Sequence, residues 1–154
     1  MPLTSSDNYF EDFAVGQTFE HVRGKTLTEM DQVLISHLVM NSAQAHFNEV
    51  HATKSGTWTG RIAFGGVTIS MILGLASQDT IENAVAVTGL DKVRLMKSVY
   101  HGDTFMAFSE VLSVADGPRP DCGEVVFKHW GVNQNDDIVM SAERRVLIKR
   151  RPGQ

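Results

Sequence analysis

Apolar and polar residues alternate along most of the second half of the chain. This period of two is typical of strands with one buried face. The alternation predicts strands at residues 91–99, 104–114, 124–134 and 137–149. A separate stretch of alternation near the start of the chain predicts a strand at residues 15–27. The last two strands are expected to form a hairpin around Asn135 and Asp136. In the strand at 91–99, Val93 and Leu95 are expected to face inward.

Two other segments follow a helical period. In the first, residues 26–38, Val33, Leu34 and Leu38 share one helical face. Thr28 is a suitable N-cap for this helix, because an acidic residue follows three positions later.

The second helical segment, residues 65–79, begins with two glycines and is apolar almost all round, as expected of a buried helix. Residues 40–58 are expected to be irregular or to contain a short helix. One strand, then helices, then long antiparallel strands predict an α+β fold in which the buried helix covers one face of the sheet.

The composition is that of an ordinary globular protein of 154 residues, with 42% apolar and 21% charged residues. The net charge of −4 argues against a general binder of nucleic acid or anionic membranes. A basic run at residues 143–151 has no interleaved aromatic platform for stacking bases. The longest apolar-leaning stretch, residues 67–76, is too short to cross a bilayer. We therefore expect neither a nucleic-acid nor a membrane partner.

The single cysteine, Cys122, lies in a loop rich in proline and glycine and is expected to have no role in chemistry. One cysteine cannot form a disulfide within the chain, which fits a reducing compartment. The first residues are polar and acidic and lack the pattern of a secretory signal. These features predict a soluble, cytoplasmic protein with one domain.

Residues 40–51, MNSAQAHFNEVH, gather polar side chains between two segments that are expected to be buried. His46 and His51 are five positions apart, whereas a helical pair of metal ligands is usually four apart. We find no complete tetrahedral set of ligands and expect no metal site.

Three motifs in order carry a resemblance to a known family: residues 40–52, 60–72 and 98–114. Together they resemble the MaoC-like (R)-specific enoyl-CoA hydratases, which have the hotdog fold, over roughly residues 12–148. The resemblance implies that residues 1–154 form a single MaoC-like hotdog domain, with an antiparallel sheet wrapped around one long central helix. It also implies a role in fatty-acid or branched-acid metabolism and no cofactor other than the coenzyme A of the substrate.

In the family, a polar residue and a histidine five positions later form the catalytic pair, which implies Asn41 and His46 here. A neutral imidazole suits a general base that takes a proton from water. Gly65 and Gly66 open the central helix, where unpaired N–H groups can stabilise the thioester oxygen. From the residues alone, His46 is more readily a structural or surface histidine, and glycines that only permit close helix–sheet packing remain the alternative for Gly65 and Gly66.

The sequence departs from the family at Asn41, where an aspartate is usual, and at Ala43, where an asparagine is common. This resembles the mesaconyl-CoA and itaconyl-CoA hydratases, which act on branched or dicarboxylic acyl groups. An amide avoids the repulsion that an ionised aspartate would exert on a substrate carboxylate. Asn41 is then expected to orient water or substrate, although an asparagine that ends a helix would have the same sequence pattern.

Other residues of the three motifs and of the strand at 91–99 are candidates for substrate binding. They are Gln44, Phe47, Arg61, Phe64, Arg94 and Lys97. The basic members suit the phosphates of coenzyme A, and a solvated strand face is the alternative for most of them.

Two other functions fit the same fold. A hotdog thioesterase usually has an acidic or polar group on the central helix, and here Thr68, Ser70, Gln78 and Asp79 are the candidates. A non-catalytic acyl-CoA-binding module is consistent with the missing aspartate. In each case the resemblance implies a homodimer that shares its sheet and builds the site at the interface, with further assembly left open.

Overall fold

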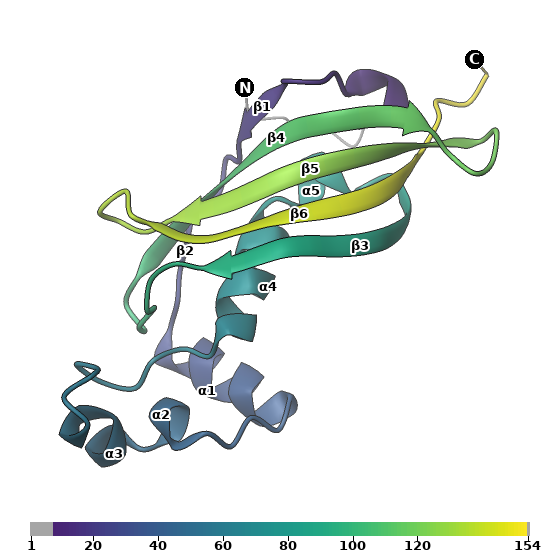
Figure 1. Cartoon of the computed structure of the whole chain (residues 1–154). Helices are drawn as coiled ribbons and strands as arrows, with labels where there is room; N and C mark the ends of the chain where they lie inside the picture. The colour runs from purple at the N-terminus through teal and green to yellow at the C-terminus, as the bar shows by residue number, and fades with distance from the viewer. Residues whose placement is uncertain (1–7, 154) are drawn as a thin grey trace.

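A computed structural model describes residues 8–153 of the chain, and its elements are shown in Figure 1. The strands are β1 (Thr18–Glu20), β2 (Lys25–Thr26), β3 (Ala84–Leu95), β4 (Thr104–Asp116), β5 (Cys122–Val132) and β6 (Ile138–Lys149). The helices are α1 (Glu29–Leu38), α2 (Gln44–Phe47), α3 (Glu49–Lys54), α4 (Gly65–Leu75) and α5 (Ser77–Thr80), with a 3-10 turn at Phe10–Asp12.

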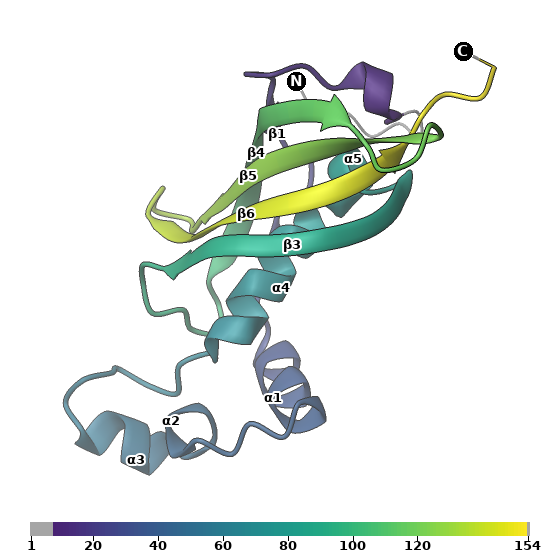
Figure 2. The same cartoon turned by 45° about the vertical axis from the view of Figure 1, so that its right-hand side comes forward.

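The long strands form one antiparallel sheet in the order β1-β4-β5-β6-β3, and β2 pairs with β4. Helix α4 runs beneath this sheet, and α1, α2 and α3 lie beyond the N-terminal end of α4 (Figures 1 and 2). The arrangement confirms the predicted α+β class. Among the described helices, none combines the length and apolarity needed to cross a membrane.

Apolar side chains of α4 pack directly on the sheet. Val67 and Ile72 are fully buried, together with Phe105 of β4 and Met140 of β6. A Cβ on Gly131 would come within 2.1 Å of the Ile72 side chain, so a glycine in β5 is what lets the helix approach this closely. Burying each such side chain contributes about 1.5–3 kcal/mol, so these contacts hold α4 against the strands.

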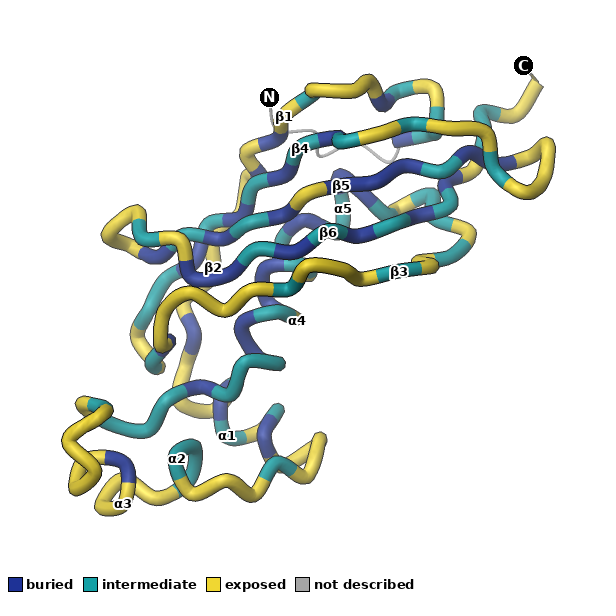
Figure 3. The backbone as a smooth tube through the Cα atoms, viewed as in Figure 1, coloured by how far each residue is buried: buried dark blue, intermediate teal, exposed yellow. Residues whose placement is uncertain are grey.

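A second apolar cluster lies at the other end of the sheet, around Phe19 and Phe127. Phe13 meets Phe127 edge to face, with ring centroids 5.2 Å apart. Figure 3 shows that buried residues follow β4, β5, β6 and α4, whereas the α1–α3 region is largely exposed.

Helix α1 begins as predicted, because Thr28 and Asp31 form a capping box. The predicted apolar face is not buried, however. Leu34 and Leu38 are 53% and 73% exposed, while the polar residue Gln32 is buried. The Gln32 amide donates to the carbonyl of Ile62 at 3.0 Å, and Ile35 packs against the core, so α1 is held through a face other than the predicted one.

Strand β3 differs from its prediction at both ends. It begins at Ala84 and ends at Leu95, and Leu95 is 52% exposed and not inward-facing. Lys92 has a φ of +49°, and the pairing with β6 shifts register between Asp91 and Arg94. Such a bulge interrupts the alternation of faces on which the prediction depended. Cys122 was also misplaced, since it is the buried first residue of β5 rather than part of a loop.

A buried chain of polar side chains joins α5 to the sheet. Asp79 contacts His21 at 2.6 Å, and His21 contacts Ser109 at 2.7 Å. Ser109 also contacts His129 at 2.7 Å, and His129 accepts a hydrogen bond from Arg144 at 3.1 Å. The contacts between Ser109, His21 and Asp79 follow the order of a Ser-His-Asp triad, but Ser109 is fully buried and has no surface open to a substrate. We therefore treat the chain as structural.

Candidate active site

Main-chain hydrogen bonds fasten the short helix α2 to the segment that precedes α4. The Ile62 N–H donates to the carbonyl of Ala45 at 3.1 Å, and the Ala63 N–H donates to the carbonyl of Val99 at 2.8 Å. Three segments that are far apart in the sequence are thus held together next to the start of α4. Side chains that leave these segments have little freedom in position.

His46 projects from α2 into this region and is held by its own hydrogen bond. Its Nδ1 lies 2.8 Å from the carbonyl oxygen of Ile62. A carbonyl oxygen can only accept, so Nδ1 carries the proton and the neutral ring has its lone pair on Nε2. The ring also meets Phe64 edge to face at 6.1 Å between centroids. Both contacts orient an imidazole whose second nitrogen can accept a proton.

The His46 ring lines a cavity of about 320 Å³. We call this the His46 cavity; it is lined by His46, Ile62, Ala63, Gly65, Thr68, Leu95, Met96, Lys97, Ser98 and Val99. The predicted base and the predicted oxyanion donor Gly65 therefore meet at one site. Thr68, one turn after the start of α4, adds a hydroxyl group to the lining.

The start of α4 has no side-chain cap, because Phe64 occupies the N-cap position. The N–H groups of Gly65 and Gly66 lie in the first turn, where no earlier turn supplies a carbonyl. A Cβ on Gly65 would meet Leu95 at 2.3 Å, and one on Gly66 would meet the Phe64 ring at 2.1 Å. The glycines thus permit close packing and also leave two polarised donors at the helix start.

The other member of the predicted pair lies elsewhere. Asn41 lines a separate cavity of about 460 Å³ together with Gln44 and Phe47. Its Oδ1 accepts a hydrogen bond from the Ala43 N–H at 3.1 Å, a local turn contact. The structure therefore brings His46 and Gly65 together in the His46 cavity, with Phe64 against the His46 ring. Phe64 and Gly66 are not among the lining residues, and neither are Asn41, Gln44 and Phe47.

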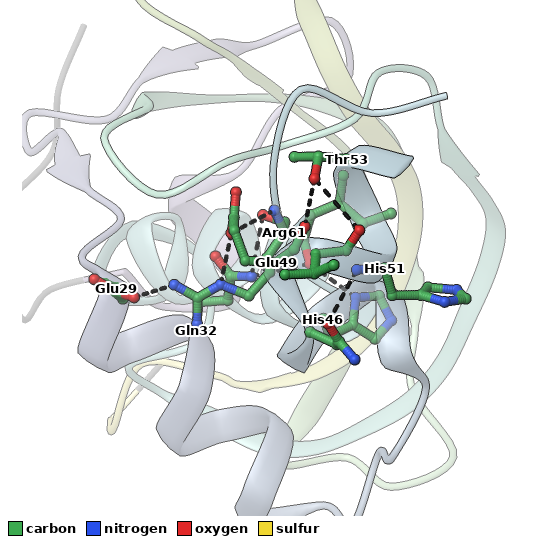
Figure 4. Close-up of polar contacts among 10 residues, drawn as sticks. Glu29, Gln32, His46, Glu49, His51, Thr53 and Arg61 are labelled. Atoms are coloured by element: carbon green, nitrogen blue, oxygen red, sulfur yellow. Dashed lines mark hydrogen bonds and ion pairs between the residues drawn. The ribbon is translucent and has the colours of Figure 1, made fainter. Parts of the chain in front are cut away.

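Arg61 is tied between two helices, as Figure 4 shows. Its guanidinium pairs with Glu29 of α1 and with Glu49 of α3, the latter at 3.0 Å. The hydrogen bond that Arg61 donates to Glu29, followed by the one that it donates to Glu49, raises the pKa of Arg61. In this structure the side chain braces the helices, and its predicted contact with phosphate stays a prediction.

The remaining two basic candidates lie at the end of β3. The Arg94 guanidinium donates to the carbonyl of Val93 at 2.9 Å and lines a small cavity on the sheet with Lys92 and Lys128. Lys97 pairs with Asp137 and lines the His46 cavity. Within residues 8–153, no group of three or more His, Cys, Asp or Glu side chains could hold a metal ion.

Sequence reasoning missed two features of this site. Ser98 lines the cavity, and the Ile62 carbonyl orients the His46 ring. A single serine has no motif that marks it as functional. A backbone carbonyl has no sequence signature at all. Only the fold, which brings residue 62 next to α2, reveals this role.

Comparisons with known proteins identify the family of the chain. A family model described as mesaconyl-CoA hydratase matches residues 12–150. A beta-methylmalyl-CoA dehydratase of Chloroflexus aurantiacus is 28% identical, over 96% of this chain and 46% of that protein. A mesaconyl-CoA hydratase of Haloarcula marismortui is 30% identical, over 97% of this chain and 44% of that protein. The chain spans less than half the length of the curated relatives it matches.

Solved structures confirm the predicted hotdog fold. A monoamine oxidase regulatory protein from Archaeoglobus superposes with a TM-score of 0.83 at 28% identity, covering 98% of this chain and 97% of that one. A Mycobacterium tuberculosis protein with a double hotdog fold gives a TM-score of 0.88 at 20% identity, covering 97% of this chain and 46% of that one. The fold, the motifs and the match over residues 12–150 together place this chain in the mesaconyl-CoA hydratase family of MaoC-like hotdog proteins.

Proposed function

We propose that the chain catalyses the (R)-specific hydration of a 2-enoyl-CoA thioester, or the reverse dehydration, on a branched or dicarboxylic acyl group. One observation carries the proposal. The Ile62 carbonyl holds the proton of His46 on Nδ1, so the lone pair of the neutral ring is on Nε2, and the ring lines a cavity that also contains the start of α4. Membership of the mesaconyl-CoA hydratase family supports the choice of substrate.

The proposed reaction uses one proton carrier. His46 Nε2 takes a proton from water as the water oxygen bonds to the β-carbon, and the double-bond electrons move towards the thioester oxygen. The N–H groups of Gly65 and Gly66 stabilise the negative charge on that oxygen. The imidazolium then returns the proton to the α-carbon, which completes the net addition of one water molecule.

Asn41 is proposed to orient the water or the substrate. In this structure its Oδ1 is bound to the Ala43 N–H, so this role requires the side chain to leave that local contact when the acyl-CoA binds. Gln44 and Phe47 share the cavity of Asn41 and are proposed to contact the same ligand.

The proposal includes a homodimer in the cytoplasm. Strand β3 ends the sheet, and its outer positions include exposed apolar side chains. These are Val85, Val87, Leu90 and Leu95. An unpaired strand edge of this kind supports pairing with a second copy. The free, buried Cys122 fits a reducing compartment.

The thioesterase alternative finds less support in the geometry. Asp79 is buried and bound to His21, away from the residues that line the His46 cavity. Of the four central-helix candidates, Thr68 alone is among the lining residues of that cavity. A hydroxyl without a neighbouring acid is a weak base for hydrolysis of a thioester.

The test follows two signals after addition of crotonyl-CoA, mesaconyl-CoA or itaconyl-CoA: loss of enoyl absorbance and release of free thiol. We expect absorbance loss without thiol, and a decrease of about 10²–10⁴-fold in kcat for His46→Ala. The matched control is His51→Ala, because His51 is exposed and points away from the cluster in Figure 4.

Each alternative result has a defined meaning. Thiol release would support the thioesterase, and binding without turnover would support the non-catalytic module. Full activity in His46→Ala would remove His46 from the mechanism.

A further inference from the structure

The His46 cavity has a one-sided charge. Of its lining residues, Lys97 alone carries a permanent charge, and none is an aspartate or glutamate. The other polar contributions come from His46, Thr68, Ser98 and the main chain. A cavity of this composition favours an anionic ligand over a cationic one.

Main-chain hydrogen bonds fix the backbone on both sides of Lys97. The Met96 N–H donates to the carbonyl of Val139 at 2.9 Å, and the Val99 carbonyl accepts from the Ala63 N–H at 2.8 Å. The backbone is thus pinned on both sides of Lys97, at the point where β3 leaves the sheet and passes the start of α4. The side chain can move its ammonium group, but its origin stays at the cavity wall.

The present partner of the ammonium group is replaceable. Lys97 pairs with Asp137, and the two side chains are 51% and 38% exposed. The hydrogen bond from Lys97 lowers the pKa of Asp137, so the carboxylate is ionised at neutral pH. Ion pairs between side chains this exposed are weak, because water screens them. A carboxylate that enters the cavity can therefore compete for the ammonium group.

We propose that Lys97 is a specificity-determining residue that binds the second, free carboxylate of a dicarboxylic acyl-CoA in the His46 cavity, exchanging Asp137 for the substrate. The inference rests on the proposed function and names the substrate class for that site. The phosphates of coenzyme A are separated from the thioester by the long pantetheine arm. A cation in the same cavity as the base and the helix start is therefore placed for the acyl group.

The test measures binding of saturated thioesters, which cannot be hydrated. Methylsuccinyl-CoA carries the second carboxylate, 2-methylbutyryl-CoA has a methyl group in its place, and free coenzyme A has neither. By calorimetric titration, we expect Lys97→Met to weaken methylsuccinyl-CoA by about tenfold or more, as for loss of one charge-assisted hydrogen bond. The other two ligands should change less than about twofold, and Lys97→Arg should retain part of the affinity.

Lys92→Met is the matched control, because Lys92 also forms an exposed ion pair, with Glu143, but is not among the lining residues of the His46 cavity. Equal losses for all three ligands in Lys97→Met would assign Lys97 to the phosphates and overturn the inference. Unchanged affinity for methylsuccinyl-CoA would overturn it as well. If the unsubstituted protein hydrates no enoyl-CoA, the proposed function fails, while these binding measurements still decide the role of Lys97.

Discussion

At the scale of single residues, the hydrogen bonds that link Arg144 to Asp79 through buried side chains all donate in the same direction. Arg144 can only donate, so His129 accepts on Nε2 and carries its proton on Nδ1. His129 then donates to Ser109, the Ser109 hydroxyl donates to His21 Nε2, and His21 Nδ1 donates to Asp79. Both rings are neutral in this arrangement. A proton added to His129 would leave its Nε2–H facing the Arg144 N–H, donor to donor. A proton added to His21 would make Ser109 accept from both rings and would leave the hydroxyl hydrogen without either ring as its acceptor.

Burial, and for His129 the nearby charge of Arg144, lowers the pKa of both rings; for His21 the Asp79 carboxylate partly opposes the effect. As the pH falls through the ordinary pKa near 6.5, the rings of the unfolded chain therefore take up protons before those of the folded chain do. Stability is therefore complete above about pH 6.5 and is lost as the pH falls below it.

We expect the free energy of unfolding in urea to fall between pH 7.5 and 5.5, by at most about 1.4 kcal/mol per ring. His51→Asn, at an exposed position, should show the same fall. An imidazole ¹⁵N signal of His129 that titrates near pH 6.5 would contradict the argument.

At the scale of elements, α1 shows what a sequence pattern can and cannot predict. The start of the helix was predictable, because the capping box is local. The buried face of the helix was not predictable, because the buried Gln32 side chain has its hydrogen-bond partner, a carbonyl, 30 residues away in the sequence. The strands β4, β5 and β6 were recovered despite single register shifts in the β4–β5 and β5–β6 pairings, whereas β3, with three shifts against β6, was predicted with the wrong bounds and inward residues. The His46 motif was found through resemblance, but the separation of Asn41 from the His46 cavity depends on how α2 sits.

The end of α1 offers a test of backbone strain. Met40 has a φ of +56° and follows the helix, with the Asn41 N–H bonded to Ser36 O and the Met40 N–H bonded to His37 O. This is the arrangement of a Schellman motif, in which glycine is preferred at the left-handed position. We expect Met40→Gly to raise the free energy of unfolding by about 0.5–1 kcal/mol, because the Cβ penalty is removed.

Met40→Ala keeps the Cβ and serves as the control for loss of the exposed side chain. Chemical denaturation of the two variants gives the comparison. If the alanine variant is as stable as the glycine variant, the left-handed backbone does not limit the stability of α1.

At the scale of the whole molecule, the sheet ends at β3 and the chain covers less than half of its curated relatives. One relative by structure has two hotdog units in one chain, and another is matched along 97% of its length by this chain alone. A single unit leaves the β3 edge and its apolar side chains uncovered. Their burial between two copies is the basis for the proposed homodimer.

The dimer can be tested by charging this edge. Val87 and Leu90 are 50% and 43% exposed on β3. We expect the double substitution Val87→Lys with Leu90→Lys to convert a dimer into a monomer in sedimentation velocity, because like charges would face each other across the pairing axis. Val15→Lys, at a 63% exposed position away from β3, should remain dimeric. A monomeric unsubstituted protein at micromolar concentration would reject the assembly.

The bond between His46 and the main chain at Ile62 has a consequence for how such proteins diversify. The carbonyl that holds the ring is present whatever residue stands at position 62, yet the side chain of that residue lines the cavity. A substitution at position 62 can therefore change the shape of the cavity while the His46 ring keeps its orientation. Under the proposed function, such a substitution would alter the acyl preference and leave the proton transfer in place.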